Sequence, residues 1–142
     1  MQVSELMSPN VVTVAQESTA AVAARLLSRN NIGSLPVCSK DGKLRGIVTD
    51  RDIVLRCVAA ENDPDITPVR EIMSRGVISV SPEDDVREAA RIMASEQVRR
   101  LPVVRDGKVV GMISLADMAR TNLFDMEASK ALSEISLNVK RR

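Results

Sequence analysis

The sequence predicts a mixed α/β (α+β) fold in which one β-α-β-β-α unit occurs twice. Three observations support this prediction. The 142-residue chain aligns with itself, each copy alternates short β-branched segments with helical patterns, and an Asp-Gly pair joins two strands in each copy. Because one copy alone would bury only a small core, we expect the two sheets to pack against each other about a pseudo-twofold axis. Such an axis would create two equivalent clefts between the copies.

The two copies match over most of the chain. Glu-Leu-Met-Ser at 5–8 matches Glu-Ile-Met-Ser at 71–74, and Leu-Pro-Val occurs at 35–37 and again at 101–103. The second copy lacks one residue in the loop before its Asp-Gly pair, where a change of length is tolerated. The alignment predicts a first repeat at 1–60, a linker at 61–68, a second repeat at 69–124 and a C-terminal helical tail at 125–142.

Each copy is expected to begin with a strand and a helix. Residues 11–14 are β-branched and short, which predicts a strand, and residues 77–80 match them. The first helix is predicted to start near Ser18. The corresponding helix of the second copy has Ser81 as its candidate N-cap and Pro82 as its first residue. The predicted buried stripes are Ala20, Ala23, Ala24 and Leu27 in the first copy, and Val86, Ala89, Ala90 and Met93 in the second.

A β-hairpin and a second helix are expected to complete each copy. The turn at Asp41-Gly42 would join strands 35–38 and 44–48, and the turn at Asp106-Gly107 would join strands 101–104 and 109–113. The second helices are predicted near 50–60 and 115–122. Within the tail, Met126, Lys130 and residues 131–139 could form a further helix, for which the sequence identifies no partner. Its basic end at 140–142 is predicted to be solvated.

Composition and charge exclude several functions. A net charge of +1, with one Phe and neither Tyr nor Trp, argues against a nucleic-acid partner. The absence of His removes imidazole catalysis and His-ligated metals. A carboxylate-only magnesium site is the alternative left open, but no motif for it is present, so we expect no catalytic residue, no metal site and no enzyme activity. No apolar run approaches the ~18 residues of a membrane span, and no signal sequence is visible. We therefore expect a cytoplasmic protein with reduced Cys38 and Cys57 in its core.

One motif occurs after the hairpin of both copies: Gly, two apolar residues, Thr or Ser, two further residues and Asp. It ends in Thr49 and Asp52 in the first copy and in Ser114 and Asp117 in the second. A carboxylate at a helix start can accept hydrogen bonds from ribose hydroxyls, while the hydroxyl and the free amides suit a phosphate. The same pattern is also a capping box. Both interpretations can hold, since Asp52 could cap the empty helix and meet ribose in the bound state.

These features together resemble the cystathionine β-synthase (CBS) domain family. The resemblance rests on the Met-Ser start, the Val-rich strand, Leu-Pro-Val, Asp-Gly and Gly-Ile-Val-Thr-Asp-Arg-Asp at 46–52, each in the family's order, and it covers about 3–122. A CBS pair is called a Bateman module, and the family's modules commonly bind AMP, ADP, ATP, S-adenosylmethionine or related ligands. The chain is similar to short bacterial proteins that consist of one such pair.

The resemblance implies a set of contacts around an adenosyl ligand. The positions that edge the adenine in the family are matched by Val12, Thr13, Ile78 and Ser79. Ile32 and Val98, each shortly before a Leu-Pro-Val strand, could form walls of the same pocket. These walls must be aliphatic in a chain so poor in aromatic residues. For each of these residues, a place in the ordinary core is the alternative.

Arginines differ between the copies. Arg99 and Arg100 precede the second Leu-Pro-Val, where the first copy has Gly33-Ser34. A guanidinium there could bind a phosphate bidentately, and Arg120 and Arg56 are further candidates. The alternative for each is a solvated side chain or a surface ion pair.

The sequence thus predicts a regulatory module that senses adenosyl nucleotides in the clefts between its repeats. It would require no cofactor, take an adenine nucleotide as its ligand, form a homodimer as Bateman modules usually do, and report to an unknown effector protein. A ligand-free interaction or scaffold module is the alternative, and a nucleotide hydrolase is a third.

Overall fold

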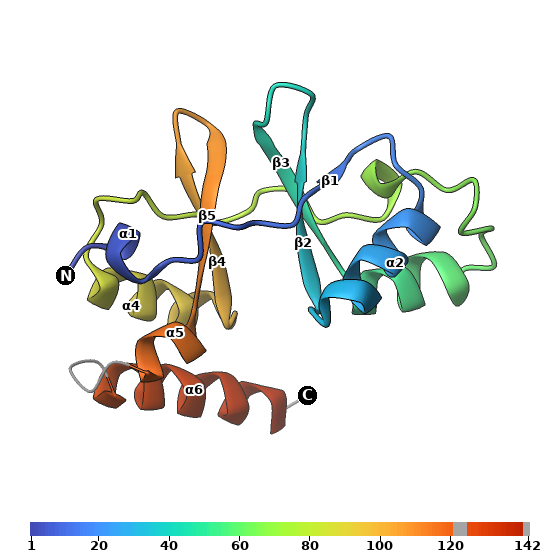
Figure 1. Ribbon diagram of the computed structural model, residues 1–142. Coiled ribbons are helices and arrows are strands. Elements are labelled where there is room, and N and C mark those ends of the chain that lie inside the picture. Colours follow the sequence, from blue (N-terminus) through green and yellow to red (C-terminus); the bar gives the residue numbers. More distant parts are fainter. Residues whose placement is uncertain (121–124, 141–142) are drawn as a thin grey trace. The chain divides into compact units, whose positions relative to one another are not determined.

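The computed structural model describes residues 1–120 and 125–140, and the chain folds into two compact units (Figure 1). Unit 1 consists of Met1–Val11, Ile78–Asp106 and Val110–Arg142, and unit 2 of Val12–Val77 and Gly107–Val109. Each unit contains a small sheet beside its own helices, which confirms the mixed α/β class.

Unit 2 is built on a three-stranded sheet in the order β1-β2-β3. Its elements are β1 (Val14–Ala15), α2 (Ala20–Asn30), β2 (Ser34–Cys38), β3 (Leu44–Thr49), α3 (Asp50–Ile53), the π-helical turn η1 (Val54–Val58) and the 3-10 turn η2 (Val69–Glu71). Strand β1 is parallel to β2, and β3 is antiparallel to β2 with Ser34 opposite Thr49.

Local sequence explains the limits of α2. Its N-cap is Thr19, whose hydroxyl accepts a hydrogen bond from the Val22 amide, and its C-cap is Asn31 in the left-handed conformation. The predicted stripe packs inward: Ala20, Ala23 and Leu27 are buried, and Ala24 packs against the same core. The proposed linker takes part in this packing, since the Thr67 carbonyl accepts from the Ala20 amide at 2.8 Å.

Unit 1 has a two-stranded sheet, and Val80 forms a single parallel bridge to Val103 on its edge. Its elements are α1 (Val3–Leu6), α4 (Val86–Glu96), β4 (Arg100–Arg105), β5 (Lys108–Ser114), α5 (Leu115–Ala119) and α6 (Asp125–Lys140). The predicted stripe of α4 is buried along its whole length.

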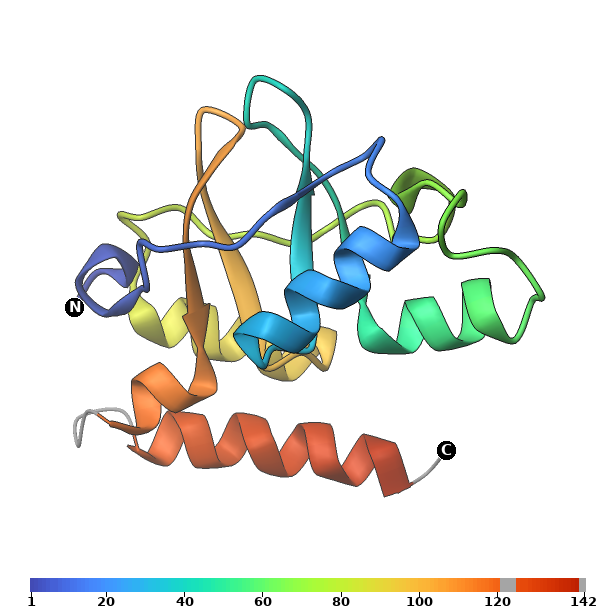
Figure 2. The ribbon, with the colours of Figure 1, turned by 45° about the vertical axis from the view of Figure 1, so that its right-hand side comes forward.

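The C-terminal helix α6 belongs to the core of unit 1. It packs on α4 and α5, and Figures 1 and 2 both show it running alongside these helices. Ala128, Ala131 and Ile135 face inward and are buried in the same cluster as Met93 and Met118. The tail therefore has the partner that the sequence does not identify; its last two residues, and 121–124 at the end of the second predicted helix, lie outside the described residues.

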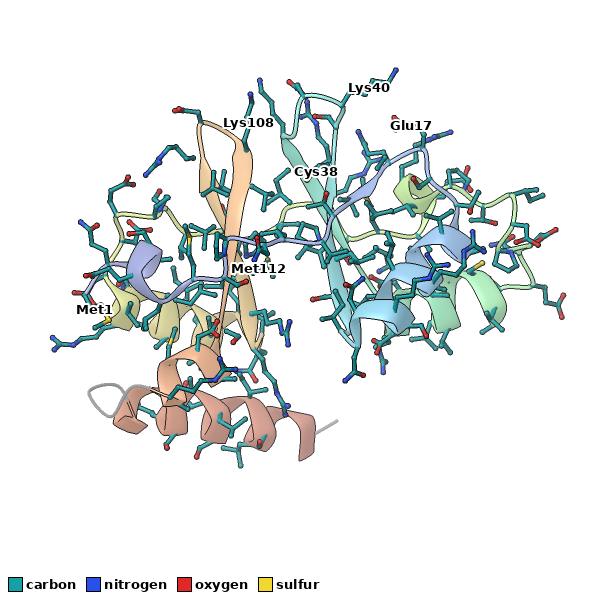
Figure 3. All side chains as sticks on the ribbon, viewed as in Figure 1. Met1, Glu17, Cys38, Lys40, Lys108 and Met112 are labelled. Atoms are coloured by element: carbon teal, nitrogen blue, oxygen red, sulfur yellow. The ribbon has the colours of Figure 1, made fainter. Side chains whose placement is uncertain are left out.

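Each unit is completed by the start of the other sequence repeat. In unit 1, Ser8 pairs with Met112 on β5, and each of their amides donates to the other's carbonyl at 2.8 and 3.0 Å. Met112 is labelled in Figure 3. In unit 2, Ser74 pairs in the same way with Ile47 on β3. The two Met-Ser segments are thus exchanged between the repeats.

The glycine that begins the repeated motif leaves room for the Met-Ser segment to cross the neighbouring strand and pair with it. A Cβ on Gly46 would lie 2.7 Å from the Ser74 carbonyl oxygen, and one on Gly111 would lie 3.0 Å from the Ser8 carbonyl oxygen. Any side chain at either position would collide with the backbone of the crossing segment.

The predicted start of the second copy's helix is wrong. Helix α4 begins at Val86 with Asp85 as its N-cap, and Ser81 instead opens a turn in which its amide donates to the Asp84 carboxylate at 2.8 Å. The reason is the docking of α1: the carbonyls of Pro82 and Asp84 accept hydrogen bonds from the first amides of α1, so they are not available to a helix that starts at Pro82.

The first strand is also shorter than predicted. Pairing with β2 begins only at Val14, because residues before it lie where the chain passes from unit 1 to unit 2 and have no neighbouring strand. The second helix of the first copy lies close to its predicted range of 50–60, because α3 and η1 together extend from Asp50 to Val58.

Both cysteines are free and buried in unit 2. Burial raises the pKa of the Cys38 thiol (labelled in Figure 3), which keeps it protonated and unreactive. No helix of the described residues combines the length and hydropathy that crossing a bilayer requires.

Candidate functional site

In unit 2 the motif is placed where β3 leads directly into α3. Thr49 is the last residue of β3 and the N-cap of α3. Its hydroxyl accepts a hydrogen bond from the Asp52 amide at 3.0 Å, while its own amide donates to Asp52 Oδ2 at 3.0 Å. The motif therefore forms a complete capping box, which fixes the carboxylate beside the hydroxyl.

Unit 1 repeats this geometry at the junction of β5 and α5. The Ser114 hydroxyl accepts from the Asp117 amide at 3.1 Å, and the Ser114 amide donates to Asp117 Oδ2 at 2.9 Å. The two units thus present the same pair of groups, hydroxyl and carboxylate, in the same relation to a helix start.

In both units the cap uses only one of the two carboxylate oxygens. Asp52 Oδ1 lies 3.8 Å from Arg56 Nε, and Asp117 Oδ1 lies 3.7 Å from Arg120 Nη1, both beyond hydrogen-bonding distance. The carboxylates are 13% and 19% exposed, whereas the arginines are 52% and 77% exposed, so these pairs are solvent-screened and weak. Oδ1 can therefore accept hydrogen bonds from a ligand while Oδ2 keeps the cap.

Of the four residues expected to edge an adenine, two lie in each unit. Val12 and Thr13 precede β1 in unit 2, and Ile78 and Ser79 precede Val80 in unit 1. Val12 is half-buried and packs against the core of its unit, but Thr13 and Ile78 are exposed and Ser79 is half-buried. The alternative that these residues belong to the ordinary core thus holds in part for Val12 and fails for Ile78.

Ile32 and Val98 differ in the same way. Ile32 packs against the core and lines a cavity of about 380 Å³ with Asp50 and Ile53. Val98 is exposed. Asp52 itself is not among the residues that line this cavity, although its neighbour Ile53 on α3 is.

The arginines also separate into two groups. Arg120 and Arg56 lie beside the motif carboxylates, and Arg56 Nη1 also donates to the carbonyls of Ile72 and Met73 at 3.3 Å each. Arg99 and Arg100 instead line a cavity of about 390 Å³ that is formed with α5 and α6. The sequence offered no signal for the backbone contacts of Arg56 or for the contribution of α6, because both depend on packing between distant segments.

Among residues 1–120 and 125–140, no three His, Cys, Asp or Glu side chains form a group that could hold a metal ion. The chain as a whole contains no His.

Comparison with known proteins identifies the class to which this fold and paired motif belong. The CBS domain model matches the chain twice, at residues 3–58 and 69–122. The CBS domain-containing protein YhcV of Bacillus subtilis is 39% identical over 134 residues, which cover 94% of each chain. Hypoxic response protein 1 of Mycobacterium tuberculosis is 34% identical over 116 residues, which cover 82% of this chain and 81% of that protein.

Solved structures show the same fold. The crystal structure of Hypoxic Response Protein I with two coordinated zinc ions has a TM-score of 0.79 at 33% identity, covering 85% of this chain and 98% of that one. The CBS domain pair of protein MJ0100, in complex with 5′-methylthioadenosine and S-adenosyl-L-methionine, has a TM-score of 0.75 at 30% identity and covers 89% and 98%.

The protein is therefore a tandem-repeat module of the CBS-pair class. The chain belongs to the CBS domain family. CBS pairs are generally regulatory modules that bind ligands rather than catalysts.

Proposed function

We propose that this protein is a regulatory module that binds an adenosyl nucleotide at the Thr49–Asp52 and Ser114–Asp117 motifs. One observation carries the proposal: in both units a carboxylate oxygen beside an N-cap hydroxyl is left without a hydrogen bond by the capping box. A ribose offers two hydroxyl donors to such an acceptor, and a nearby phosphate would meet the helix start.

The relatives support the chemical class of the ligand. The MJ0100 pair was crystallised with two adenosyl compounds, and that pair covers nearly nine-tenths of this chain. Thr13, Ile78 and Ser79 supply solvent-accessible groups, so they are proposed to contact the adenine together with Val12. Ile32 and Val98 are proposed as more distant walls.

The two units are not expected to bind equally. Arg56 of unit 2 is engaged with the carbonyls of Ile72 and Met73, whereas Arg120 of unit 1 contacts only Asp117 among the described side chains. A free guanidinium favours a charged phosphate. Unit 1 is therefore proposed to prefer phosphorylated ligands such as AMP or ATP.

The mechanism is a population shift, in which the ligand favours one conformation and a partner detects it. The proposal includes a homodimer and an unidentified effector protein. It places the protein in the cytoplasm, a reducing compartment, which the two buried cysteines without a disulfide fit. It assigns the protein no catalytic step.

Isothermal titration with AMP, ATP, S-adenosylmethionine and NAD tests the proposal. Wild-type protein should bind at least one of them, and Asp117→Asn or Asp52→Asn should weaken binding by about tenfold, because Asn keeps the cap but loses the charged acceptor. Asp85→Asn is the matched control, since Asp85 caps α4 by accepting from the Arg87 amide away from the motifs. It should bind as the wild type does.

Three results would contradict the proposal. Absence of heat with all four ligands up to millimolar concentration would favour the ligand-free scaffold module, whose partner binding should be unaffected by both Asn variants. Equal weakening by Asp85→Asn would mean that the effect comes from folding. Release of phosphate from ATP with magnesium would favour the hydrolase.

A further inference from the structure

The sequence Asp-Gly-Lys occurs at both hairpin turns, and turn geometry accounts for only part of it. Gly42 and Gly107 have φ angles of +84° and +80°, which glycine adopts far more readily than other residues. Aspartate is likewise a common turn residue. Neither turn requires the lysine that follows its glycine, so Lys43 and Lys108 need another explanation.

The two lysines lie directly opposite each other. Lys43 and Lys108 form an antiparallel bridge within unit 2, in which the amides after the lysines donate to the carbonyls of the opposite glycines at 2.9 and 3.4 Å. In this non-hydrogen-bonded kind of pair the Cα atoms are about 4.5 Å apart and the side chains start on the same face. Like charges placed in this way weaken the pairing of two strands. The hairpins alone therefore gain nothing from having both lysines.

The stem of each lysine packs on the opposite turn. A Cβ on Gly107 would lie 3.6 Å from Lys43 Cγ, and one on Gly42 would lie 3.9 Å from Lys108 Cδ. The absence of a side chain on either glycine thus leaves a flat surface on which the lysine stem of the other turn rests. Stems that are already packed lose less rotamer freedom when the ammonium groups bind a partner.

Two more cations complete a basic patch. Lys40 lies in the turn between β2 and β3, and Figure 3 shows Lys40 and Lys108 at the ends of the hairpins. Arg45 has no opposite residue on β2, because the register of the two strands shifts at this point. The four cations are exposed and form the hairpin patch: Lys40, Lys43, Arg45 and Lys108.

The turn carboxylates do not neutralise these cations. A hydrogen bond from the Ser39 hydroxyl lowers the pKa of the Asp41 carboxyl, and the charges of Lys43 and Arg45 lower it further. Lys43 Nζ lies 3.9 Å from Asp41 Oδ2, an exposed pair that contributes little. Even if Asp106, the aspartate of the other turn, is counted with Asp41, positive charge remains in excess on the hairpin patch.

The hairpin patch is separate from the ligand motif of unit 2. Ser34 pairs with Thr49 beside the motif, whereas Cys38 pairs with Leu44 beside the turn. The length of β2 lies between these two ends of the hairpin, which corresponds to roughly 15 Å. A role for the patch must therefore differ from that of the motif.

An acidic protein segment suits the hairpin patch better than other anionic partners. The chain has one Phe and neither Tyr nor Trp, so it offers almost nothing on which nucleic-acid bases could stack. The turns at 39–43 and 106–108 contain no apolar side chain that could enter a bilayer. In an extended peptide, acidic residues at every second position face the same side about 7 Å apart. This spacing allows successive carboxylates to reach cations on two adjacent turns.

We propose that the hairpin patch is a docking surface for an extended acidic segment of a partner protein. Carboxylates of that segment contact Lys43 and Lys108 and relieve the repulsion between them, while Lys40 and Arg45 extend the contact along the turn. Because the contact is made by exposed charges, added salt weakens it. Docking requires no nucleotide at the motifs, so it stands apart from the nucleotide-binding function.

Fluorescence anisotropy of a labelled peptide tests this docking surface on the full chain. The peptide alternates Glu and Gly over about ten residues, and a second peptide has Gln in place of each Glu. At low salt the Glu peptide should bind at least about tenfold more tightly than the Gln peptide, and about 0.5 M NaCl should abolish the difference. In ¹⁵N NMR spectra the Glu peptide should shift the amide signals of Gly42, Gly107 and Lys108 and leave those of Thr49 and Asp52 in place.

Joint replacement by Lys43→Gln and Lys108→Gln should weaken binding of the Glu peptide at least about tenfold. This variant should unfold at no lower a urea concentration than the wild type, because it removes a like-charge pair. Lys43→Arg with Lys108→Arg keeps the charge and should retain binding. Arg87→Gln with Lys130→Gln is the matched control, since it removes two exposed cations from α4 and α6 of unit 1. Its affinity should stay within about twofold of the wild type.

Four results would overturn the docking surface. These are equal affinity for the Glu and Gln peptides, an equal loss of affinity in the control variant, amide shifts confined to the motifs, or tighter binding of single-stranded DNA than of the Glu peptide. The last would assign the hairpin patch to nucleic acid instead. Failure of AMP, ATP, S-adenosylmethionine and NAD to bind would contradict the nucleotide-binding function and leave the docking surface unaffected.

Discussion

At Gly46 and Gly111, the absence of a side chain decides whether a neighbouring segment can pass. Each glycine lies under the backbone of a Met-Ser segment, with the nearest carbonyl oxygen 2.7 or 3.0 Å from where a Cβ would be. Met73 Sδ and Met7 Sδ are as close, at 2.8 and 2.5 Å. A methionine side chain can move, but the paired backbone of Ser74 or Ser8 cannot move without losing its two hydrogen bonds.

Gly46→Ala and Gly111→Ala should each lower the free energy of unfolding by about 1–3 kcal/mol, the usual cost of overpacking. Urea denaturation followed by circular dichroism measures this loss. Gly33→Ala is the matched control, because its Cβ would meet only the Asp50 carboxylate at an ordinary 3.5 Å. A loss in Gly33→Ala as large as in the other two would show that the effect does not depend on the Met-Ser segments, since Gly→Ala without a clash is not expected to destabilise.

At this scale the local parts of the site follow from the sequence. The capping boxes of Thr49–Asp52 and Ser114–Asp117 form as the pattern predicts, because all their groups lie within four residues of one another. The contacts of Arg56 with Ile72 and Met73 join residues far apart in the chain, and no local pattern encodes them.

Helix α6 is the element about which the sequence says least. Its helical pattern is visible, but its burial depends on α4 and α5, which offer apolar residues to it only after they have folded. The reverse holds at the start of α4, where a good local N-cap signal at Ser81 and Pro82 is overridden by hydrogen bonds to α1. Tertiary contacts thus determine both a helix boundary and a helix partner.

Ile135→Ala should destabilise unit 1 by about 2 kcal/mol or more, since Ile135 is 5% exposed and its removal leaves a cavity. Leu137→Ala in the same helix should cost within about 0.5 kcal/mol, because Leu137 is 53% exposed. Hydrogen exchange measured by mass spectrometry should locate the Ile135 effect in α6, α4 and α5. Equal effects of both variants would contradict the packing of α6 described above.

In the whole molecule, the folded units and the sequence repeats do not coincide. Met-Ser at 7–8 and at 73–74 are identical in sequence, so alignment alone gives no reason for either to prefer one glycine over the other. The structure assigns the first to Gly111 and the second to Gly46. Two repeats could therefore be predicted from the sequence, but the exchange of their first segments could not.

Two fragments of equal length test this arrangement: 12–77, which follows unit 2, and 1–66, which follows the first repeat. The 12–77 fragment keeps Val69, Ile72 and Met73 in the core of unit 2, whereas 1–66 loses them and carries α1 without its partners. We expect dispersed amide signals in ¹⁵N NMR spectra from 12–77 and collapsed ones from 1–66. A folded 1–66 with a disordered 12–77 would contradict the exchange.

The exchanged segments also impose an order on synthesis at the ribosome. Nearly all of unit 2 is contiguous, so its core can assemble once residue 77 has emerged. Helix α1 is translated before unit 2, but the elements on which it packs, α4 and β5, are translated after unit 2. During elongation the segment from α1 to Ser8 must therefore remain undocked until α4 and β5, with which it pairs, have been synthesised.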